Sequence, residues 1–361
     1  MGRSALILAM FAILLSPLSA QTWEGKTVKD GDVIVVQNPK TPLYPAGSLV
    51  LKEELRIGGE NSVPKATLGL FTQVQIDSAG RIYVADMKDS LIKVYGADGS
   101  FLRAFGGKGQ GPAEFRLVSE LVLNPVSGQV YAIDVLKTVI FSPTGEFERS
   151  VPVLERWTHT RQDSKGRFLA ESSIRGPKTW VQFLKRYESL GEKGVVIKEW
   201  PGLNESKPTA FPARPAWDLD GNDRLYLAHG SEYRIEIMDA AGRVIQRIEK
   251  EDRQVPVSSE DKETYRKSLP AALRSQPMEY ESRYPYFHDF KVDEKGRVLV
   301  HTYKKSGDAS RFDVFDEQGR FIAEIDLPFP VMAFRFDKIY TREYDAEGYL
   351  IVKRYALNWK K

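Results

Sequence analysis

The chain has 361 residues, of which 42% are hydrophobic, so it contains enough apolar material for a sizeable core. Its 52 basic and 49 acidic residues are mixed along the sequence without long blocks, a pattern that gives no support to nucleic acid as a partner. The absence of cysteine excludes disulfide bonds, so packing of the core must stabilise the fold.

The first 20 residues have the features of a secretory signal peptide. Arg3 gives a positive start, residues 5–15 form an apolar core, and small residues precede a cleavage site predicted between Ala20 and Gln21. The apolar run is shorter than the roughly 20 residues that a transmembrane helix needs. We therefore predict a secreted or periplasmic protein with one domain, residues 21–361, and no stable membrane span after cleavage. An uncleaved membrane anchor is the alternative.

Two strand-like runs, residues 32–38 and 48–59, follow the signal peptide and are separated by a loop with three prolines. A four-strand unit then appears twice, in residues 74–105 and 121–150. Each copy has short apolar runs that alternate with polar residues and are joined by turns rich in Gly, Asp, Asn and Pro, which is typical of an antiparallel meander. Further copies occupy residues 161–200, 218–248, 290–325 and, in poorer form, 343–357.

The recurring element of these copies is an Asp or Asn, a Gly a few residues later, and then an alternating strand. Asp and Gly form a tight turn, and the spacing between turns is close to the roughly 40–50 residues of one propeller blade. The sequence therefore predicts an all-β fold, a six-bladed β-propeller of four-stranded antiparallel blades. We expect the sixth copy to supply two strands and both N-terminal runs to complete that blade, which closes the ring. The turn glycines are Gly80, Gly128, Gly166, Gly221, Gly296 and Gly348.

Residues 257–273 interrupt the repeat. They begin with a Ser cap and an acidic first turn and keep a helical pattern until Pro270. We predict a short helical insertion on one mouth of the propeller. It is interpreted either as packing decoration or as a functional element, which would be a lid or a partner-docking element. The glycine-rich run 107–111 lacks the context of a phosphate-binding loop, and we interpret it as an interblade connection whose glycines adopt positive φ.

Residues 80–86, GRIYVAD, and residues 91–115, which end in Gly-Pro-x-x-Phe, carry a family likeness. They resemble the NHL repeat, and the whole chain resembles bacterial six-bladed propellers of the NHL-repeat and TolB-like type. The resemblance implies a toroid with strands that radiate from a central channel. It also implies a choice of functions, because such families include protein-binding scaffolds and, more distantly, calcium-dependent lactonases, peptidyl amidating lyases and strictosidine-synthase-like enzymes.

Candidate ligand-binding residues come from aligning the copies on their turns. In a propeller the first strand of each blade lines the channel, so the residues four before each turn are expected to form a ring at one mouth. His288 lies one position earlier, and Tyr286 belongs to an aromatic segment that leads from the insertion into a channel strand. The residues of the aligned ring are Gln73, Glu120, His159, Ala216, Asp289 and Thr341.

These residues support a binding site at the channel mouth, with Gln73, Glu120, His159, His288, Asp289 and Tyr286 as its predicted members. No catalytic triad or paired-carboxylate motif occurs, so we favour a non-enzymatic exported scaffold that binds a protein, peptide or small molecule. We predict no cofactor, with calcium or zinc as the alternative. The competing functions are a metal-dependent lyase or lactonase at the same mouth and a purely structural module. The sequence does not specify an oligomeric state.

Overall fold

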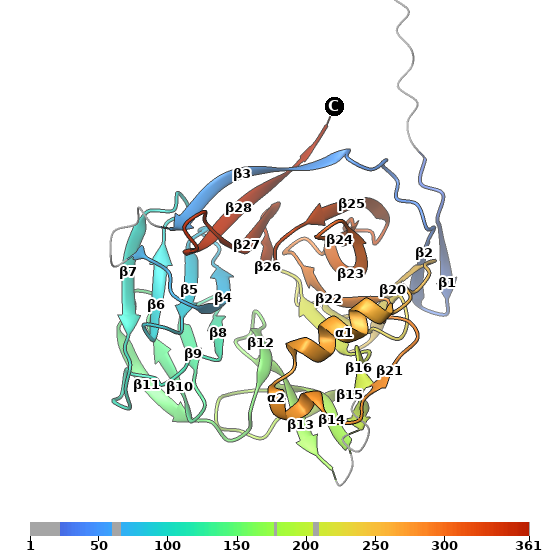
Figure 1. Cartoon of the computed structure of the whole chain (residues 1–361). Coiled ribbons are helices and arrows are strands. Elements are labelled where there is room, and N and C mark those ends of the chain that lie inside the picture. The colour runs from blue at the N-terminus through green and yellow to red at the C-terminus, as the bar shows by residue number, and fades with distance from the viewer. Residues whose placement is uncertain (1–21, 60–65, 177–178, 205–208, 361) are drawn as a thin grey trace, which may run out of the picture.

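The computed structural model describes residues 22–59, 66–176, 179–204 and 209–360. The predicted signal peptide lies outside the described residues. Six sheets stand around a central axis, each with its strands stepping outward from the channel (Figure 1). This arrangement confirms the six-bladed propeller and its antiparallel four-stranded blades.

The first three blades follow the predicted copies in order. Each is a meander in which the first strand lies innermost and consecutive strands pair antiparallel. Blade 1 contains β4 (Phe71–Ile76), β5 (Ile82–Asp86), β6 (Leu91–Tyr95) and β7 (Phe101–Gly106). Blade 2 contains β8 (Glu120–Leu123), β9 (Val130–Ile133), β10 (Lys137–Phe141) and β11 (Phe147–Pro152). Blade 3 contains β12 (Thr158–Gln162), β13 (Phe168–Arg175), β14 (Thr179–Tyr187) and β15 (Val195–Asn204).

The other three blades complete the ring, and two of them include strands from the N-terminal part of the chain. Blade 4 contains β17 (Pro215–Leu219), β18 (Leu225–His229), β19 (Arg234–Met238) and β20 (Val244–Lys250), extended by β2 (Val33–Asn38) and β1 (Lys26–Asp30). Blade 5 contains β22 (Phe287–Val292), β23 (Val298–Ser306), β24 (Ala309–Phe315) and β25 (Phe321–Leu327). Blade 6 contains β26 (Val331–Arg335), β27 (Lys338–Tyr344), β28 (Leu350–Trp359) and β3 (Leu49–Gly58).

The two ends of the chain close the ring in blade 6. Strand β3 pairs antiparallel with β28 over its whole length, from Gly58 opposite Ile351 to Leu49 opposite Trp359. Closure by N- and C-terminal strands in one blade is therefore confirmed. The expected division of strands is wrong, however, because the C-terminal segment supplies three strands and the N-terminal part supplies β3 alone.

The cause of this error is the first turn of blade 6. Strands β26 and β27 are joined by Phe336 and Asp337, which have φ values of 54° and 59°. Such a two-residue turn contains no Asp-x-x-Gly signal. The signal at Asp345 joins β27 to β28 instead, so Thr341 lies on the second strand of its blade and not in the innermost ring.

The run 32–38 is also corrected, because β2 pairs parallel with β20 in blade 4 instead of joining blade 6. Asn38 holds it there. Its Nδ2 donates to the carbonyl of Gly319 at 2.9 Å, and its Oδ1 accepts the amide of Phe321 at 2.7 Å. The side-chain amide of Asn38 is buried and satisfies main-chain groups of the neighbouring blade. These hydrogen bonds, and not the hydrophobic alternation of the run, decide where the strand lies.

The turns confirm the expected role of Asp and Gly, and they add an arginine to the motif. Asp77 Oδ1 accepts the amide of Arg81, and its Oδ2 accepts the Arg81 Nε at 2.6 Å. The same Asp–Arg pair, four residues apart, occurs in the first turns of blades 3, 4 and 5. Gly221 departs from the pattern, because Asp223, with φ 59°, takes the left-handed position there.

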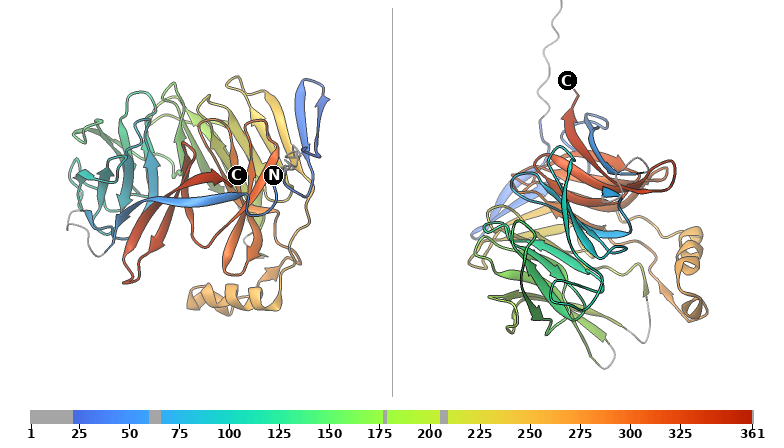
Figure 2. Two further views of the ribbon diagram at one scale, coloured as in Figure 1. Left: turned by 90° about the horizontal axis from the view of Figure 1, so that it is seen from above. Right: turned by 90° about the vertical axis from the view of Figure 1, so that its left-hand side faces the viewer.

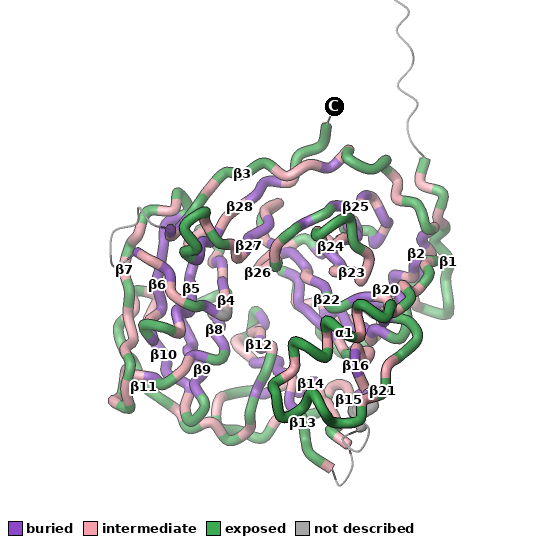
Figure 3. Tube along the Cα trace, viewed as in Figure 1, coloured by how far each residue is buried: buried purple, intermediate pink, exposed green. Residues whose placement is uncertain are grey.

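The core lies between neighbouring blades. Between blades 1 and 2, for example, Ile92 and Val94 pack with Val130 and Val139, and none of these side chains is accessible to solvent. Buried residues accordingly follow the strands, whereas the insertion is largely exposed (Figure 3). Among the described residues, no helix is long and apolar enough to cross a membrane.

The predicted helical insertion is present as α1 (Ser259–Ser268) and α2 (Ala271–Arg274). Neither helix contains a buried residue. Both stand away from the blades on one side of the ring (Figure 2). The insertion is anchored by a short parallel pair, β16 (Thr209–Ala210) with β21 (Glu279–Tyr280). An element that buries so little of itself against the blades leaves space beneath it.

Candidate functional site

A cleft of about 750 Å³ lies between α1 and blade 5. We call it the α1 cleft. Its walls come from the helix, from the segment before β17, and from β22 and β23, so residues distant in sequence meet there. The lining residues are Phe211, Pro212, Arg214, Glu260, Asp261, Thr264, Tyr265, Ser268, Tyr284, His288, Thr302, Tyr303, Lys304, Lys305 and Ser310.

Local contacts position the helix over this cleft. Ser258 and Asp261 form a capping box, in which the Asp261 amide donates to the Ser258 hydroxyl and the Ser258 amide donates to the Asp261 carboxylate. Farther along the helix, the Tyr265 ring lies 4.7 Å from that of Phe211, and Phe211 lies the same distance from Tyr284. The aromatic bridge therefore attaches the helix to the blade side of the cleft, and the capping box fixes its first turn.

A column of five rings runs from the cleft into blade 5. Tyr284 stacks on Tyr303 with centroids 4.5 Å apart, and Tyr303 stacks on His288 at 3.5 Å. His288 continues to His301 at 4.3 Å, and His301 to Phe312 at 4.6 Å. The interplanar angles lie between 11° and 26°. Strand pairing sets this order, because His301 lies directly opposite Phe312 in the β23–β24 ladder.

The cleft also carries charges of both signs. Lys304 is already paired, since its Nζ lies 2.7 Å from Asp252 Oδ2. Asp261 is bound by the Ser258 hydroxyl, which lowers its pKa with help from Tyr284 and Lys305. Arg214 and Lys305 are exposed, and neither has an ion pair with another described residue. These two cations are therefore available to a ligand.

Two of the predicted site residues hold neighbouring blades together. Gln73 Oε1 accepts the amide of Leu121 at 2.8 Å, which links blades 1 and 2. Glu120 accepts the amides of His159 at 3.0 Å and Thr160 at 3.1 Å, which links blades 2 and 3. The structure thus gives both side chains hydrogen-bond partners within the ring.

The two channel histidines occupy equivalent positions that the sequence alignment had separated. His159 is the extra residue where the β12–β13 register shifts between Thr158 and Thr160. His288 is the extra residue where the β22–β23 register shifts between Phe287 and Asp289. Bulges of this kind re-aim a side chain out of the ladder. The alignment of blade 3 was therefore displaced by one residue, because a bulge leaves no signal in the alternation pattern.

His159 is positioned by its neighbour in blade 4. Its ring lies 4.7 Å from the Trp217 indole in an edge-to-face arrangement, and its Nε2 is buried without a hydrogen-bond partner in the described structure. Burial lowers the pKa of His159 to about 3, and Arg161 and Lys291 add to this effect. His288 is exposed toward the cleft, but desolvation by the surrounding protein and the nearby His301 lower its pKa to about 4. Both imidazoles are neutral near pH 7.

Asp289 and Tyr286 lie outside the lining of the α1 cleft. Asp289 Oδ1 is 3.7 Å from His301 Nδ1, and its Oδ2 is 3.8 Å from Lys291 Nζ. Although burial acts to raise it, the pKa of Asp289 is lowered by Lys291 and the histidines. Tyr286 borders a separate hollow with Tyr233 and packs on the core of blades 4 and 5. Of the six predicted site residues, His288 lines the α1 cleft.

Sequence reasoning missed several residues of this region. Arg214, Tyr303 and Lys305 precede or follow the aligned positions, and no motif singles them out. Glu171 on β13 was also missed. Burial raises its pKa to about 7, and the nearby Glu120 carboxylate contributes to this shift. Its position opposite Thr158 on β12 follows from strand pairing, which the sequence pattern does not show residue by residue.

No group of three or more His, Asp or Glu side chains suitable for one metal ion occurs in the part of the chain that the structure describes. The interpretation as a metal-dependent lyase or lactonase stays a prediction.

The prediction for the glycine-rich run 107–111 is corrected in one respect. Gly107, Gly109 and Gly111 do not have positive φ. Gly109 is needed because it has no side chain. A Cβ at this position would lie 2.0 Å from the Glu114 carboxylate, which accepts a hydrogen bond from the Gly111 amide.

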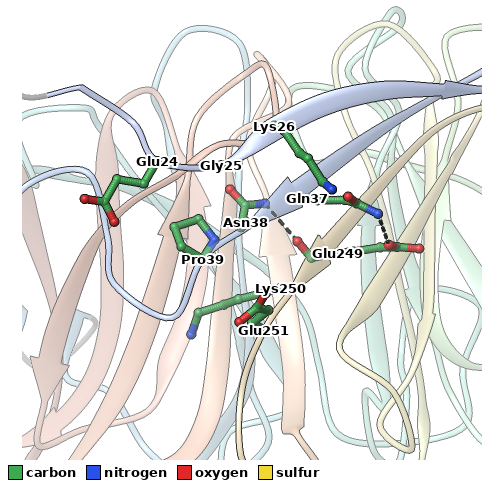
Figure 4. Close-up of a pocket in the computed structure, with 9 residues that line it drawn as sticks. All are labelled: Glu24, Gly25, Lys26, Gln37, Asn38, Pro39, Glu249, Lys250 and Glu251. Carbon is green, nitrogen blue, oxygen red and sulfur yellow. Dashed lines mark hydrogen bonds between the residues drawn. The ribbon is translucent and has the colours of Figure 1, made fainter.

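A second hollow, of about 360 Å³, lies at the outer edge of blade 4 (Figure 4). It is bordered by the β1–β2 extension and the end of β20. Asn38 and Gln37 both reach Glu249 there, through its carbonyl at 3.1 Å and its carboxylate at 3.5 Å. These contacts attach β2 to β20, so this hollow is part of a structural joint.

Comparisons with known proteins agree with the fold. The model of the DUF5128 family, described as a 6-bladed beta-propeller, matches residues 67–169. A candidate exported protein from Bacteroides fragilis has a TM-score of 0.57 at 13% identity, covering 91% of this chain and all of that one. A DUF4221 family member from Bacteroides vulgatus has a TM-score of 0.53 at 11% identity, covering 86% of this chain and 99% of that one.

At these identities the two structures are similar to this chain in fold alone. No curated protein matches the sequence. The site must therefore be interpreted from its own geometry.

Proposed function

We propose that this protein is an exported propeller of the NHL-repeat type that acts as a binding scaffold, with the α1 cleft as its ligand site. The observation that carries the proposal is the cleft itself. Its volume of about 750 Å³ falls within the roughly 300–1,000 Å³ that is usual for small-molecule sites. Stacked rings form one wall, and hydroxyl and charged groups form the rest.

Export is supported by the signal-peptide pattern of the first 20 residues and by the similar fold of a candidate exported protein. Binding, as opposed to a purely structural role, is supported by the chemistry of the cleft. A packing decoration is expected to bury apolar side chains, whereas α1 buries none and leaves Tyr303 and His288 facing the cleft. Apolar surface with a few placed polar groups is typical of ligand sites.

A fragment screen by ligand-observed NMR tests the proposal, with two tryptophan variants on the same helix. Thr264 lines the cleft, so Thr264→Trp fills it. Lys267 does not line the cleft and pairs with Glu263, so Lys267→Trp is the matched control. We expect fragments that bind the wild type to lose at least tenfold in affinity with Thr264→Trp and to keep their affinity with Lys267→Trp. Equal binding to both variants would contradict the assignment of the site.

A further inference from the structure

We propose that one end of blade 2 docks on an anionic lipid surface through three aliphatic side chains, Val135, Leu136 and Leu154. These side chains are 64%, 58% and 72% exposed. Single exposed aliphatic residues are common on soluble proteins, whereas several that adjoin one another mark a contact surface. We call the three residues the blade 2 tip. The proposal does not depend on a ligand in the α1 cleft.

Strand pairing places the three side chains next to one another. Val135 and Leu136 lie between β9 and β10, and Leu154 follows the last strand of the blade. The Val153 amide donates to the Leu136 carbonyl at 3.0 Å, so the chain after β11 continues the antiparallel ladder of β10 and β11. In this register Leu154 lies across from Val135, and residues that lie opposite each other in a ladder have adjacent side chains.

The turn between β9 and β10 departs from the usual turn chemistry. A hydrogen bond from the Asp134 amide to the Lys137 carbonyl closes it at 2.8 Å, which leaves Val135 and Leu136 as its two central residues. Turns of this kind favour Asn, Asp and Gly. The equivalent turns of blades 1, 4, 5 and 6 each contain a serine or a glycine, namely Ser90, Gly230, Gly307 and Gly348. Aliphatic residues at an exposed turn add nothing to the core, so we attribute them to a contact outside the chain.

Two arginines flank the blade 2 tip. The Arg116 amide donates to Asp134 Oδ2 at 3.0 Å, and the Val135 amide donates to Oδ1 of the same carboxylate at 2.6 Å, so Arg116 lies beside the turn. Arg156 follows Leu154 closely in the chain. Both arginines are exposed, and neither has an ion pair within the described ranges. They are therefore available to anionic groups outside the chain.

The carboxylates near the tip do not cancel the charge of these arginines. Asp134 is buried, accepts main-chain amides, and is offset by Lys137 on the other side of the turn. Glu155 pairs with Lys185. Glu192, which borders a hollow beside the tip, is followed in the chain by an exposed lysine. The two arginines thus leave an excess of positive charge around the aliphatic groups.

The shape of this corner favours a lipid surface over a protein partner. The hollow beside the tip has a volume of about 20 Å³, which is too small to receive a side chain. Strong protein interfaces centre on large side chains that fill pockets, and Leu and Val are under-represented in them. Aliphatic groups that enter the boundary between head groups and acyl chains, next to arginines that attract anionic lipids, are typical of peripheral membrane contacts. The export proposed above brings the chain to such a surface.

This contact gives the ring an orientation. Leu154 belongs to the linker between the last strand of blade 2 and the first strand of blade 3, and the insertion with α1 occupies the corresponding linker between blades 4 and 5. Linkers of this kind lie at the same end of the ring, from which the helices stand away (Figure 2). Docking through the blade 2 tip therefore turns the end that carries the α1 cleft toward the lipid.

Co-sedimentation with large unilamellar vesicles tests the proposal, with the chain that starts at residue 21. One set of vesicles is phosphatidylcholine alone, and the other is an equimolar mixture with phosphatidylglycerol. We expect binding to the mixture to be at least about fivefold tighter, because each basic residue near an anionic surface adds to the attraction. Absence of binding to the mixture, or equal binding to both sets, would overturn the proposal.

Variants assign the binding to residues, after urea melts have shown that each variant folds. Leu136→Ser and Leu154→Ser are each expected to weaken binding to the mixture at least about tenfold, because a polar group replaces a side chain that enters the lipid. Arg116→Gln combined with Arg156→Gln is expected to weaken it at least about fivefold and to leave binding to phosphatidylcholine alone unchanged.

The matched control for the leucine variants is Val126→Ser. Val126 is 74% exposed, in the turn between β8 and β9 at the opposite end of the same blade. This variant should keep the affinity of the wild type. A loss of binding as large as that of Leu136→Ser would show that the blade 2 tip is not the docking surface.

A fluorescent label identifies the side chain that enters the lipid. The chain has no cysteine, so Leu136→Cys and Val126→Cys each provide a single site for the environment-sensitive dye nitrobenzoxadiazole. We expect a blue shift of the label at position 136 on addition of the mixed vesicles, and no shift at position 126. If Leu136→Ser instead abolishes a self-association measured by analytical ultracentrifugation and leaves vesicle binding unchanged, the tip is an interface between copies of the chain and the lipid proposal is overturned.

Discussion

The carboxylate of Glu120, on the innermost strand of blade 2, accepts the backbone amide of Thr160, on the innermost strand of blade 3, at 3.1 Å. Related links connect Gln73 to the amide of Leu121 and Asp218 to the amide of Val292. Polar side chains of the channel thus join successive blades by satisfying main-chain donors of the next strand. Part of the polarity of the channel is therefore structural.

Glu120→Ala is expected to lower the free energy of unfolding by about 2–6 kcal/mol. The substitution leaves the buried amide of Thr160 and the neighbouring amide of His159 without their acceptor, and each such loss costs about 1–3 kcal/mol. Urea denaturation followed by tryptophan fluorescence measures the change. Glu148→Ala is the control, because Glu148 is exposed and bonds the side chain of Gln129. Equal stability of the two variants would show that the link is not stabilising.

Gly80→Ala and Gly296→Ala are expected to destabilise the fold, each by at least about 1 kcal/mol, because a Cβ is unfavourable in the left-handed region. Their φ values are 76° and 93°. The effect should be larger at Gly296, where the new Cβ would lie 2.5 Å from both the Arg224 guanidinium and the Tyr226 hydroxyl.

The control for these turns is Gly107→Ala. Gly107 does not have positive φ, and its nearest neighbour, Glu114 Cγ, would lie 3.7 Å from the added Cβ. Its urea midpoint should match that of the wild type. A midpoint for Gly296→Ala at or above that of Gly107→Ala would refute the role assigned to the turn.

Two truncations distinguish the contribution of the closing strand β3 to stability from that of the β1–β2 extension of blade 4. A chain that starts at residue 40 keeps β3 and loses β1 and β2, so we expect a cooperative unfolding transition at lower urea. Its destabilisation includes the loss of Asn38, which satisfies two main-chain groups of blade 5. A chain that starts at residue 66 loses β3 and exposes the edge of β28, and we expect aggregation or a non-cooperative transition. Two equally cooperative transitions would disprove closure through β3.

The free energy of unfolding should depend on pH through His159 and Glu171, whose contributions change in opposite directions as pH changes. Burial lowers the pKa of His159 to about 3 in the folded protein, from 6.5. Between these values the unfolded chain binds the proton and the folded chain does not, so this group's contribution falls as pH falls. Burial raises the pKa of Glu171 to about 7, from 4.5. Between these values the folded chain holds the proton, so the contribution of Glu171 falls as pH rises.

Urea melts at pH 5, 6 and 7 separate the two contributions, because His159→Asn removes one and Glu171→Gln removes the other. Asn suits the His159 position because it tolerates the positive φ of 49° found there. Relative to wild type, the slope of unfolding free energy against pH should become more negative with His159→Asn and more positive with Glu171→Gln. Each change is at most about 1.4 kcal/mol per pH unit. Parallel lines for all three proteins would contradict these assignments.

Much of the fold could be predicted because its signals are local. An Asp-x-x-Gly turn and the alternating strand that follows it lie close together in the chain, and each repeat needs a neighbour to cover its apolar face. Blades 1 to 5 follow directly from these patterns. Blade 6 could not be divided correctly, because its first turn, at Phe336 and Asp337, has two residues with positive φ and lacks the Asp-x-x-Gly motif found in other blades.

The candidate site was predicted less completely, for a related reason. His288 was found because it lies near a recognisable turn, whereas Arg214 and Tyr303 reach the α1 cleft from other strands without any motif. Bulges at His159 and His288 shift the register by one residue, and an alternation pattern does not reveal such a shift.

By itself, the sequence determined the repeating strand, the tight turns, the number of blades and the presence of a helical insertion, because hydrophobic alternation and turn chemistry act between residues close in the chain. The tertiary structure decided which strand closes the ring, which polar side chains join blades, and which rings and cations surround the α1 cleft. Those contacts join residues far apart in the chain, such as Asn38 and Phe321, and their geometry exists only once the blades have packed.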